Sequence, residues 1–315
     1  MGVSAAPAVR VGTRGSKLAL TQTTTAAEAV AAAGGFTPEL VTIRTEGDVL
    51  TGPLSQMGGT GVFATALRAA LLDGSVDLAV HSLKDLPTAP VPGLEVAAVP
   101  EREDPRDALC ARDGLTLAQL PAGARVGTGS PRRAAQVRAA RPDLEIVDIR
   151  GNVGTRLARV APGDLDAVVL AASGLRRLGL QEAVTELIDP AVMLPAPGQG
   201  ALALEVRAED ATGTGPLAAG LAAVDHLPTR LAVTAERELL SRLEAGCAAP
   251  VGTLARTAGD ELVLDVVVAD PDGSEVMRRH GSTAERTVAG ARALGTRLAD
   301  ELLADGAGRL ARLTL

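Results

Sequence analysis

One short segment occurs twice in this chain, and the two copies constrain the fold more than any other feature. Arg10-Val-Gly-Thr13 and Arg125-Val-Gly-Thr128 each end a short apolar stretch with strand character and come just before a serine. These serines, Ser16 and Ser130, are expected to cap helices, because their hydroxyl oxygen can accept a hydrogen bond from a free N–H group of the first helical turn. The repeated order of strand, loop and helix predicts two lobes of like topology.

Strand and helix patterns alternate through both halves of the chain. In the first half we expect a strand near Val9, a helix from about Lys17 to Ala33, a strand from Leu40 to Arg44 and a helix from about Val62 to Leu72. Such alternation is typical of α/β domains, whose ligand sites lie at the carboxyl ends of the strands. The predicted fold class is therefore α/β: two similar lobes of mixed, mostly parallel sheet with flanking helices, like periplasmic binding proteins, plus a small C-terminal α+β domain.

Two crossovers set the expected boundaries of the lobes. The charged, proline-bearing stretch Glu101–Arg106 leads out of the first lobe. Leu194-Pro-Ala-Pro-Gly-Gln-Gly200 is a hinge, and the apolar run Ala201–Val206 after it is expected to return to the first lobe as an added strand.

The C-terminal part has a different pattern. It predicts a helix over Arg230–Leu243, a hairpin around Pro271-Asp-Gly273 and a terminal helix that begins near Thr283. We expect domain 1 at residues 1–102 and 200–218, domain 2 at 106–195, and domain 3 at 222–315.

Arginines are concentrated in two short loops, Gly127–Arg133 and Ile149–Arg156, although the formal net charge of the chain is −7. Ser130-Pro131 is typical of an N-cap and first helical residue, which puts Arg132 and Arg133 in the first helical turn. Cations are disfavoured there by typically ~0.3–1 kcal/mol at an exposed site. A bound polyanion would remove this conflict. The alternative is that arginine is abundant and falls near helix starts by chance.

Composition excludes several classes of protein. Tryptophan and tyrosine are absent and the sequence pI is 5.2, so nucleic acid is not an expected partner. No apolar run approaches the roughly 20 residues that span a bilayer, and the first residues have no signal-peptide pattern, so we expect a cytoplasmic protein without membrane contact. The two cysteines and three dispersed histidines have no metal-ligand spacing, and no metal is expected.

Several motifs occur in a fixed order along nearly the whole chain. They are Thr13-Arg-Gly-Ser16, His81-Ser-Leu-Lys-Asp-Leu-Pro87, the two arginine loops, Gly174-Leu-Arg-Arg-Leu-Gly179, the hinge motif, and Leu243-Glu-Ala-Gly-Cys247. This combination resembles the porphobilinogen deaminase family, also called hydroxymethylbilane synthases. The resemblance implies a monomeric three-domain transferase of heme biosynthesis, which joins four porphobilinogen molecules head to tail, with loss of ammonia, into hydroxymethylbilane.

The resemblance also implies a covalent cofactor, one dipyrromethane per chain. The dipyrromethane is held by a cysteine thioether and serves as the primer. By position in its motif, that cysteine is Cys247, on an expected loop after a helix end. Cys110, inside the strand-like Asp107-Ala-Leu-Cys-Ala111, is expected to be a small buried apolar residue.

Asp85 is the expected catalytic residue. Loss of ammonia leaves a cationic electrophile and the later coupling must discard a proton, so a carboxylate near the pyrrole N–H serves both needs. The alternative is a turn aspartate before Pro87. Lys84, one of only two lysines, is expected to pair with a substrate carboxylate, with a surface salt bridge as the alternative. Lys17 is expected to be solvated.

Each pyrrole carries an acetate and a propionate, so a growing chain brings many carboxylates into one cavity. Buried charges must be paired, and the planar arginine fork suits carboxylates well. The family positions expected to bind cofactor and substrate from the two lobes are Arg14, Ser16, Ser130, Arg132, Arg133, Arg150, Arg156 and Arg177.

Other positions remain open. Phe63 lies either near the pyrrole rings or in the core. His81 is expected to be a core histidine whose hydrogen bonds are satisfied. Gln199 is expected to form hydrogen bonds across the lobes. Thr60 and Thr65 replace lysines of the family in the lid-like stretch from Thr45 to Thr65, from which we assign no site residue. The rival hypothesis is a two-lobed anion-binding protein without catalysis, because fold alone does not decide function.

Overall fold

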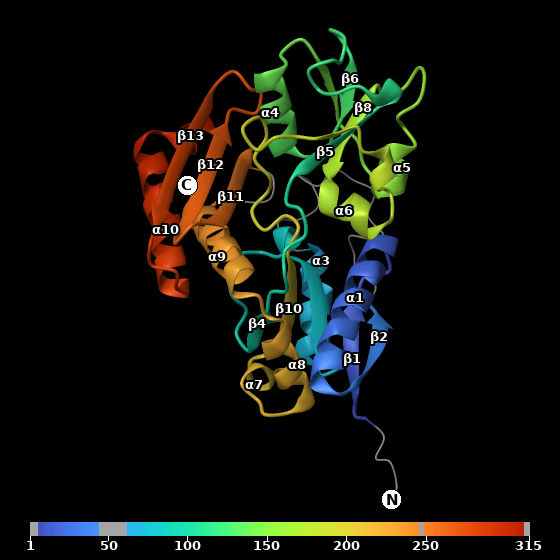
Figure 1. Ribbon diagram of the computed structural model, residues 1–315, viewed down its shortest axis with the longest axis vertical. Coiled ribbons are helices and arrows are strands. Elements are labelled where there is room, and N and C mark those ends of the chain that lie inside the picture. Colours follow the sequence, from blue (N-terminus) through green and yellow to red (C-terminus); the bar gives the residue numbers. More distant parts are fainter. Residues whose placement is uncertain (1–5, 44–61, 246–248, 312–315) are drawn as a thin grey trace, which may run out of the picture. The chain divides into compact units, whose positions relative to one another are not determined.

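The computed structural model describes residues 6–43, 62–245 and 249–311, without the side chains of residues 62 and 63 (Figure 1). The chain forms two compact units, Met1–Arg102 with Ala201–Arg230 (unit 1) and Glu103–Gly200 with Leu231–Leu315 (unit 2). The division into three domains stays a prediction.

Unit 1 contains a five-stranded mixed sheet in the order β2-β1-β3-β10-β4. Strand β1 pairs in parallel with β2 and β3, whereas β10 is antiparallel to β3 and β4. The predicted return of the apolar run after the hinge is therefore confirmed. The strands are β1 (Ala8–Thr13), β2 (Thr37–Thr42), β3 (Leu78–Ser82), β4 (Leu94–Ala98) and β10 (Leu202–Arg207).

Helices cover both faces of this sheet (Figure 1). Helix α1 (Lys17–Gly34) begins at Ser16, whose hydroxyl accepts a hydrogen bond from the N–H of Ala19, as predicted. It packs with α8 (Pro216–Val224) on an apolar face that includes Val11, Val30 and Leu204. Helix α3 (Val62–Leu72) packs on the other face. The described part of the unit also contains two short elements, the 3₁₀ turn η2 (Leu83–Asp85) and helix α7 (Ala208–Ala211).

Unit 2 contains a second five-stranded sheet, in the order β7-β6-β8-β5-β9. Strand β6 is parallel to β7 and β8, and β5 is antiparallel to β8 and β9. In each sheet, four strands run in one direction and one strand, β10 or β5, runs antiparallel between two of them, which confirms the two lobes of like topology. The strands are β5 (Asp107–Ala111), β6 (Arg125–Gly127), β7 (Glu145–Val147), β8 (Ala167–Ala171) and β9 (Glu186–Leu187).

Helices also cover both faces of the second sheet. Helix α4 (Pro131–Ala140) packs on one face, and α5 (Val153–Leu157) and α6 (Ala172–Arg177) pack on the other. Two 3₁₀ turns, η3 (Arg112–Gly114) and η4 (Gln181–Ala183), lie in its connections. The fold class of the chain is α/β, as expected.

The C-terminal part of unit 2 is an antiparallel sheet covered by helices. The prediction that the terminal helix begins near Thr283 is wrong by about one turn. Strand β13 continues to Thr283, and the helix is capped by Thr287, whose hydroxyl accepts from the N–H of Gly290 at 3.0 Å. The elements are α9 (Leu227–Arg242), β11 (Val251–Ala258), β12 (Glu261–Ala269), β13 (Val276–Thr283), α10 (Val288–Ala304) and α11 (Ala307–Leu310).

Candidate active site

A pocket of about 90 Å³ in unit 1 brings three of the expected site residues together. Arg14 and Ser16 enter it from the loop between β1 and α1, and Asp85 enters from the 3₁₀ turn after β3. These loops follow the carboxyl ends of two parallel strands, where ligand sites of α/β sheets are expected. The remaining lining comes from α1, α3 and β3: Leu18, Ala19, Gln22, Ala64, Leu67, Val80, His81 and Ser82.

The turn that carries Asp85 is held by its neighbours. Leu83 and Leu86 are buried, and the N–H of Leu83 donates to the carbonyl of Ala201 at 3.0 Å. The hydroxyl of Ser82 donates to Oε1 of Gln22 at 3.0 Å. Asp85 itself is exposed. A fixed backbone with an accessible carboxylate is the arrangement that a proton-transferring residue needs. Lys84 is half-buried in the same turn.

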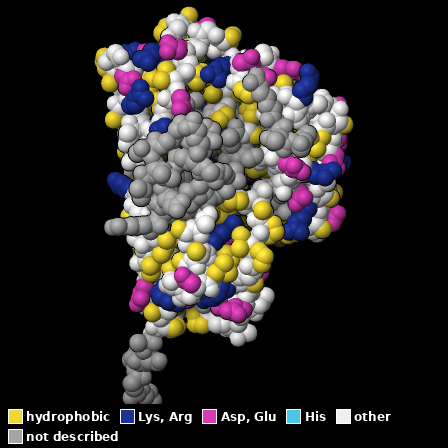
Figure 2. Space-filling model, turned by 180° about the vertical axis from the view of Figure 1, so that it is seen from behind, with side chains coloured by type: hydrophobic (Ala, Val, Ile, Leu, Met, Phe, Trp, Pro, Cys, Tyr) yellow, Lys and Arg dark blue, Asp and Glu magenta, His cyan; other side chains and the backbone are white. Residues whose placement is uncertain are grey.

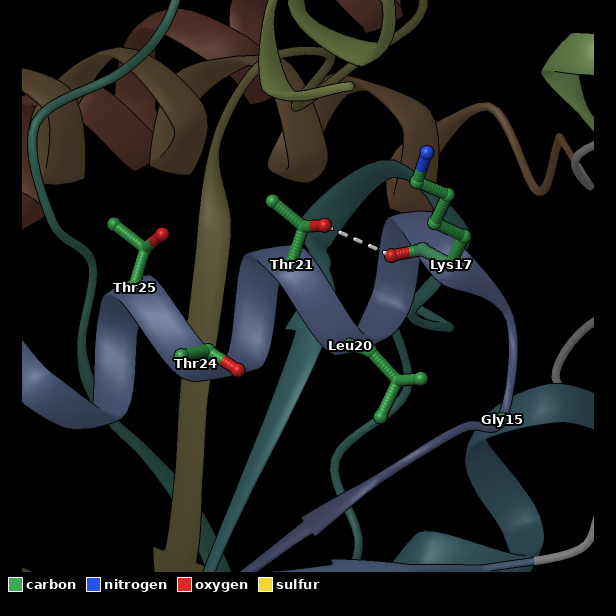
Figure 3. A pocket seen from close by; sticks show the side chains of 6 residues that line it. All are labelled: Gly15, Lys17, Leu20, Thr21, Thr24 and Thr25. Atoms are coloured by element: carbon green, nitrogen blue, oxygen red, sulfur yellow. Dashed lines mark hydrogen bonds between the residues drawn. The ribbon is translucent and has the colours of Figure 1, made fainter. Parts of the chain in front are cut away.

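Next to the start of α1 lies a larger, open hollow of about 480 Å³ (Figure 3). Threonines and Leu20 of α1 line it together with Gly15 and Lys17. Lys17 is exposed, as expected, and its carbonyl accepts a hydrogen bond from the hydroxyl of Thr21 at 3.0 Å. Among the described residues that line this hollow, only Lys17 carries a charge.

The predicted start of α4 is confirmed. Ser130 is the N-cap, with its hydroxyl as acceptor for the N–H of Arg133, and Pro131 is the first helical residue. The two arginines that follow are only 4% and 5% exposed. Both pair with Asp107, which is fully buried at the start of β5: Arg132 at 2.7 Å and Arg133 at 2.8 Å.

Sequence analysis expected a bound polyanion to balance these arginines, but the chain itself supplies one carboxylate, that of Asp107. Sequence reasoning missed this residue. The available signal was an aspartate at the start of an otherwise apolar strand. Its partners are 25 and 26 residues away, so no local pattern joins them.

Backbone carbonyls and a glutamine complete this arginine cluster. Arg132 donates to the carbonyl of Leu194 at 2.6 Å, and Arg133 donates to the carbonyl of Val169 at 3.1 Å. The side-chain amide of Gln199 donates to Asp107 and to the carbonyl of Pro105, both at 2.8 Å. Pro105, Asp107 and Gln199 all belong to unit 2, so these two hydrogen bonds of Gln199 lie within one unit.

The arginine cluster has more positive than negative charge. Burial would raise the pKa of Asp107, but the two guanidiniums outweigh it and hold that pKa far below its usual range. Burial lowers the pKa of Arg132 despite its pairing with Asp107. Two guanidiniums thus share one carboxylate, and within the described part of the chain the buried Nε of Arg132 has no hydrogen-bond partner. A second carboxylate fits such a donor set.

The second arginine loop packs against the first. A Cβ on Gly129 would lie 2.5 Å from the carbonyl oxygen of Ile149, so only glycine permits this approach. Arg150 is exposed, with Asp148 at 3.4 Å, and Arg156 donates from Nε to the carbonyl of Gly151 at 2.7 Å. In contrast to the buried pair, Arg150 is available to a ligand from solvent.

Arg177 lies at the end of α6 and contacts the hinge. It donates to the carbonyl of Gly200 at 2.7 Å, and burial lowers its pKa. Gly200 has a φ of 90°, and a Cβ there would lie 2.3 Å from the carbonyl oxygen of Glu103, so the two crossovers pack directly on each other.

Some expected residues lie outside the described part of the chain. These are Cys247, the side chain of Phe63, and most of the stretch from Thr45 to Thr65. Cys110 is described and buried, as expected, and burial raises the pKa of its thiol to about 11.

Acidic and basic side chains are interspersed over the described part of the face in Figure 2. Among the described residues, no cluster of three or more histidine, cysteine or acidic side chains could hold a metal ion. None of the described helices combines the length and apolar character required to cross a bilayer.

Comparison with known proteins gives consistent matches. Residues 9–214 match the family model described as porphobilinogen deaminase, dipyromethane cofactor binding domain, and residues 230–304 match the porphobilinogen deaminase C-terminal domain. The chain is 59% identical to a porphobilinogen deaminase of Leifsonia xyli, over 97% of this chain and 95% of that protein. It is 55% identical to one of Micrococcus luteus, over 96% and 94% respectively.

Among solved structures, the chain is similar to a periplasmic substrate-binding protein of an ABC transporter from Coxiella burnetii. The TM-score is 0.44 at 18% identity, over 69% of this chain and 91% of that one. A methionine-binding protein matches with a TM-score of 0.42 at 12% identity, over 69% and 89%.

Proposed function

The chain belongs to the porphobilinogen deaminase family, and we propose that the pocket of unit 1 and the arginine cluster of unit 2 carry that family's reaction here. The activity is that of a hydroxymethylbilane synthase in tetrapyrrole biosynthesis, with a dipyrromethane cofactor-binding domain. This membership decides against the rival hypothesis of an anion-binding protein without catalysis.

We assign the acid–base work to Asp85. When ammonia leaves the aminomethyl group of porphobilinogen, positive charge develops on the substrate, and a carboxylate beside it lowers the energy of that state. The same carboxylate can accept the proton that the attacked ring carbon releases on coupling. Arg14 and Ser16 line the pocket with Asp85 and are suited to hold a substrate carboxylate next to it.

The arginine cluster is assigned to binding the carboxylates of cofactor and growing chain. Its excess positive charge and the buried Nε of Arg132 support this assignment. Bound dipyrromethane would supply the primer to which substrate units are added, tethered to Cys247. Its proposed binding residues in this chain are Arg14, Ser16, Lys84, Ser130, Arg132, Arg133, Arg150, Arg156 and Arg177.

Three further statements are proposals of the same kind. We propose three domains, at residues 1–102 with 200–218, 106–195 and 222–315. The separate family matches at 9–214 and 230–304 support a boundary before the third. We also propose that the enzyme is a monomer, as the family resemblance suggests, and that it works in the cytoplasm, as expected from the sequence.

The accessible carboxylate of Asp85 in a pocket with Arg14 and Ser16 carries the proposed mechanism, and Asp85→Asn tests it. The amide keeps the shape of the side chain but cannot act as a base or balance positive charge. We expect ammonia release from porphobilinogen to slow by about 10²–10⁴-fold, the usual contribution of general acid–base catalysis.

Asp73→Asn is the matched control. Asp73 is an exposed turn aspartate of the same unit, whose carboxylate accepts from the N–H of Ser75 at 2.8 Å. If Asp85 were only a turn residue, the two variants would behave alike. Ammonia release at the wild-type rate in Asp85→Asn would remove Asp85 from the mechanism.

A further inference from the structure

A buried carboxylate, that of Glu205, contacts the pocket-lining His81, and the proposed mechanism does not use it. Glu205 belongs to β10, where its neighbours Leu204 and Val206 are fully buried, and it is itself only 2% exposed. Burying an ion pair is costly, and well-packed apolar residues of similar volume often stabilise a core equally well or better. A charge at this position of an apolar strand therefore calls for a role other than stability.

The buried His81 and the half-buried Arg68 contact Glu205 from different elements. Arg68 of α3 forms a forked contact, with Nε 3.0 Å from Oε1 and 3.1 Å from Oε2, and Nη2 2.9 Å from Oε1. From β3, Nε2 of His81 lies 3.1 Å from Oε2 of Glu205. Burial would raise the pKa of Glu205, but His81 and Arg68 outweigh it and lower that pKa, so the carboxylate is ionised at neutral pH.

His81 connects this cluster to the catalytic turn. In the antiparallel pairing of β10 with β3, Ala203 lies opposite His81 and Glu205 lies opposite Ala79. Side chains alternate along a strand, so Glu205 and His81 share one face of the sheet. His81 also lines the pocket with Asp85, and η2 follows β3 directly. Burial confirms that His81 is a core histidine, but the expected satisfaction of its ring is not confirmed, because its Nε2 lies near Glu205 without the geometry of a hydrogen bond.

Helix α3, which carries Arg68, also contributes to the lining of the pocket. Arg68 follows Leu67, and both Leu67 and Ala64 of α3 line the pocket. The carboxylate of Glu205 thus links α3, β3 and β10, and α3 and β3 both contribute to the wall of the pocket that contains Asp85. A shift in any of the three elements would move that wall.

We propose that Glu205 is a positioning residue which, through His81 and Arg68, holds the pocket wall in the geometry that Asp85 needs. This inference depends on the proposed role of Asp85. In this role Glu205 affects catalysis indirectly, because displacement of a reacting group by about 1 Å can reduce the rate on the order of 10²-fold.

A second ionic cluster on the same two strands offers a matched control. Asp77, just before β3, pairs with Arg10 at 2.7 Å and with Arg207, the last residue of β10, at 3.3 Å. It joins neighbouring strands of the sheet as Glu205 does. The residues of this second cluster do not line the pocket.

The experiment compares Glu205→Gln with Asp77→Asn in the full-length enzyme carrying its cofactor. We measure kcat and KM for ammonia release from porphobilinogen, and the melting temperature Tm. For Glu205→Gln we expect kcat to fall by about 10- to 100-fold with KM changed by less than about threefold. For Asp77→Asn we expect kcat within about twofold of wild type, whatever the loss of Tm.

A kcat of Glu205→Gln within about threefold of wild type would overturn the inference, as would an equal kcat loss in both variants. The paired replacement Arg68→Met with Glu205→Leu removes both charges together and is expected to leave a folded core. A purely structural pair predicts normal kcat in that double variant, whereas the positioning role predicts a loss of at least about tenfold. Arg68→Lys, which keeps the charge, should restore part of the rate relative to Arg68→Ala.

Asp85→Asn distinguishes failure of the positioning role from failure of the proposed function. If Asp85→Asn is inactive and Glu205→Gln is fully active, only the positioning role is lost and the proposed function stands. If Asp85→Asn retains full activity, the proposed mechanism fails, and the positioning role that depends on it fails too.

Discussion

Replacement of Asp107 by asparagine tests whether the arginine cluster is held by its single internal carboxylate. The change keeps the size of the side chain and removes the one negative charge that Arg132 and Arg133 share. All three side chains are at least about 95% buried, so solvent cannot replace the lost partner. Breaking a buried pair in this way typically costs about 3–5 kcal/mol.

That cost predicts a large change in Tm. For a cooperative unit of 150–250 residues, 1 kcal/mol corresponds to roughly 2–4 °C, so the unfolding transition of unit 2 should fall by about 6–20 °C. Calorimetry of the wild type, Asp107→Asn and the control Asp143→Asn measures it. Asp143 pairs with Arg141 at 2.6 Å at the surface, where solvent screens the charges, and its loss should shift Tm by less than about 2 °C. A shift for Asp107→Asn no larger than that of the control would refute the reasoning.

Two further predictions concern the pH dependence of stability, through Asp107, and the attachment of the cofactor, through Cys247. Because pairing holds the folded-state pKa of Asp107 below the unfolded value of about 3.9, its contribution to stability is complete above that pH and is lost as the pH falls toward the folded-state pKa. In urea unfolding at pH 5, 4 and 3, wild type should therefore lose stability more steeply than Asp107→Asn, and equal slopes would contradict the assignment. Intact mass spectrometry should show excess mass equal to dipyrromethane in wild type and in Cys110→Ala, but not in Cys247→Ala, and an active wild type without the adduct would contradict the cofactor assignment.

Local features of the fold were predictable because they depend on neighbours in the chain. The caps at Ser16 and Ser130 involve an N–H only three residues away, and the alternation of apolar and polar residues follows the period of each element. The start of the terminal helix was missed because Thr283 and Thr287 are equally good caps by composition. Strand pairing through Thr283 with Leu262 decided between them.

The candidate site also has features that the sequence predicted and features that depend on tertiary structure. Sequence motifs were enough to identify the family and to select Asp85, Arg14 and Ser16, since the chemistry of those residue types is independent of their partners. That Arg14, Ser16 and Asp85 line one pocket, in agreement with the placement of ligand sites at strand ends, is a result of the parallel pairing of β1 and β3.

By itself, then, the amino-acid sequence determined the two-lobed α/β class, the helix caps at Ser16 and Ser130, and the family to which the chain belongs. Only the tertiary structure decided which charges compensate each other. Asp107 meets its arginines across about 25 residues, and Glu205 meets Arg68 across 137. Such pairs form because a buried ion must be neutralised by a partner. Which partner lies close enough depends on tertiary packing and cannot be predicted from the spacing of residues along the chain.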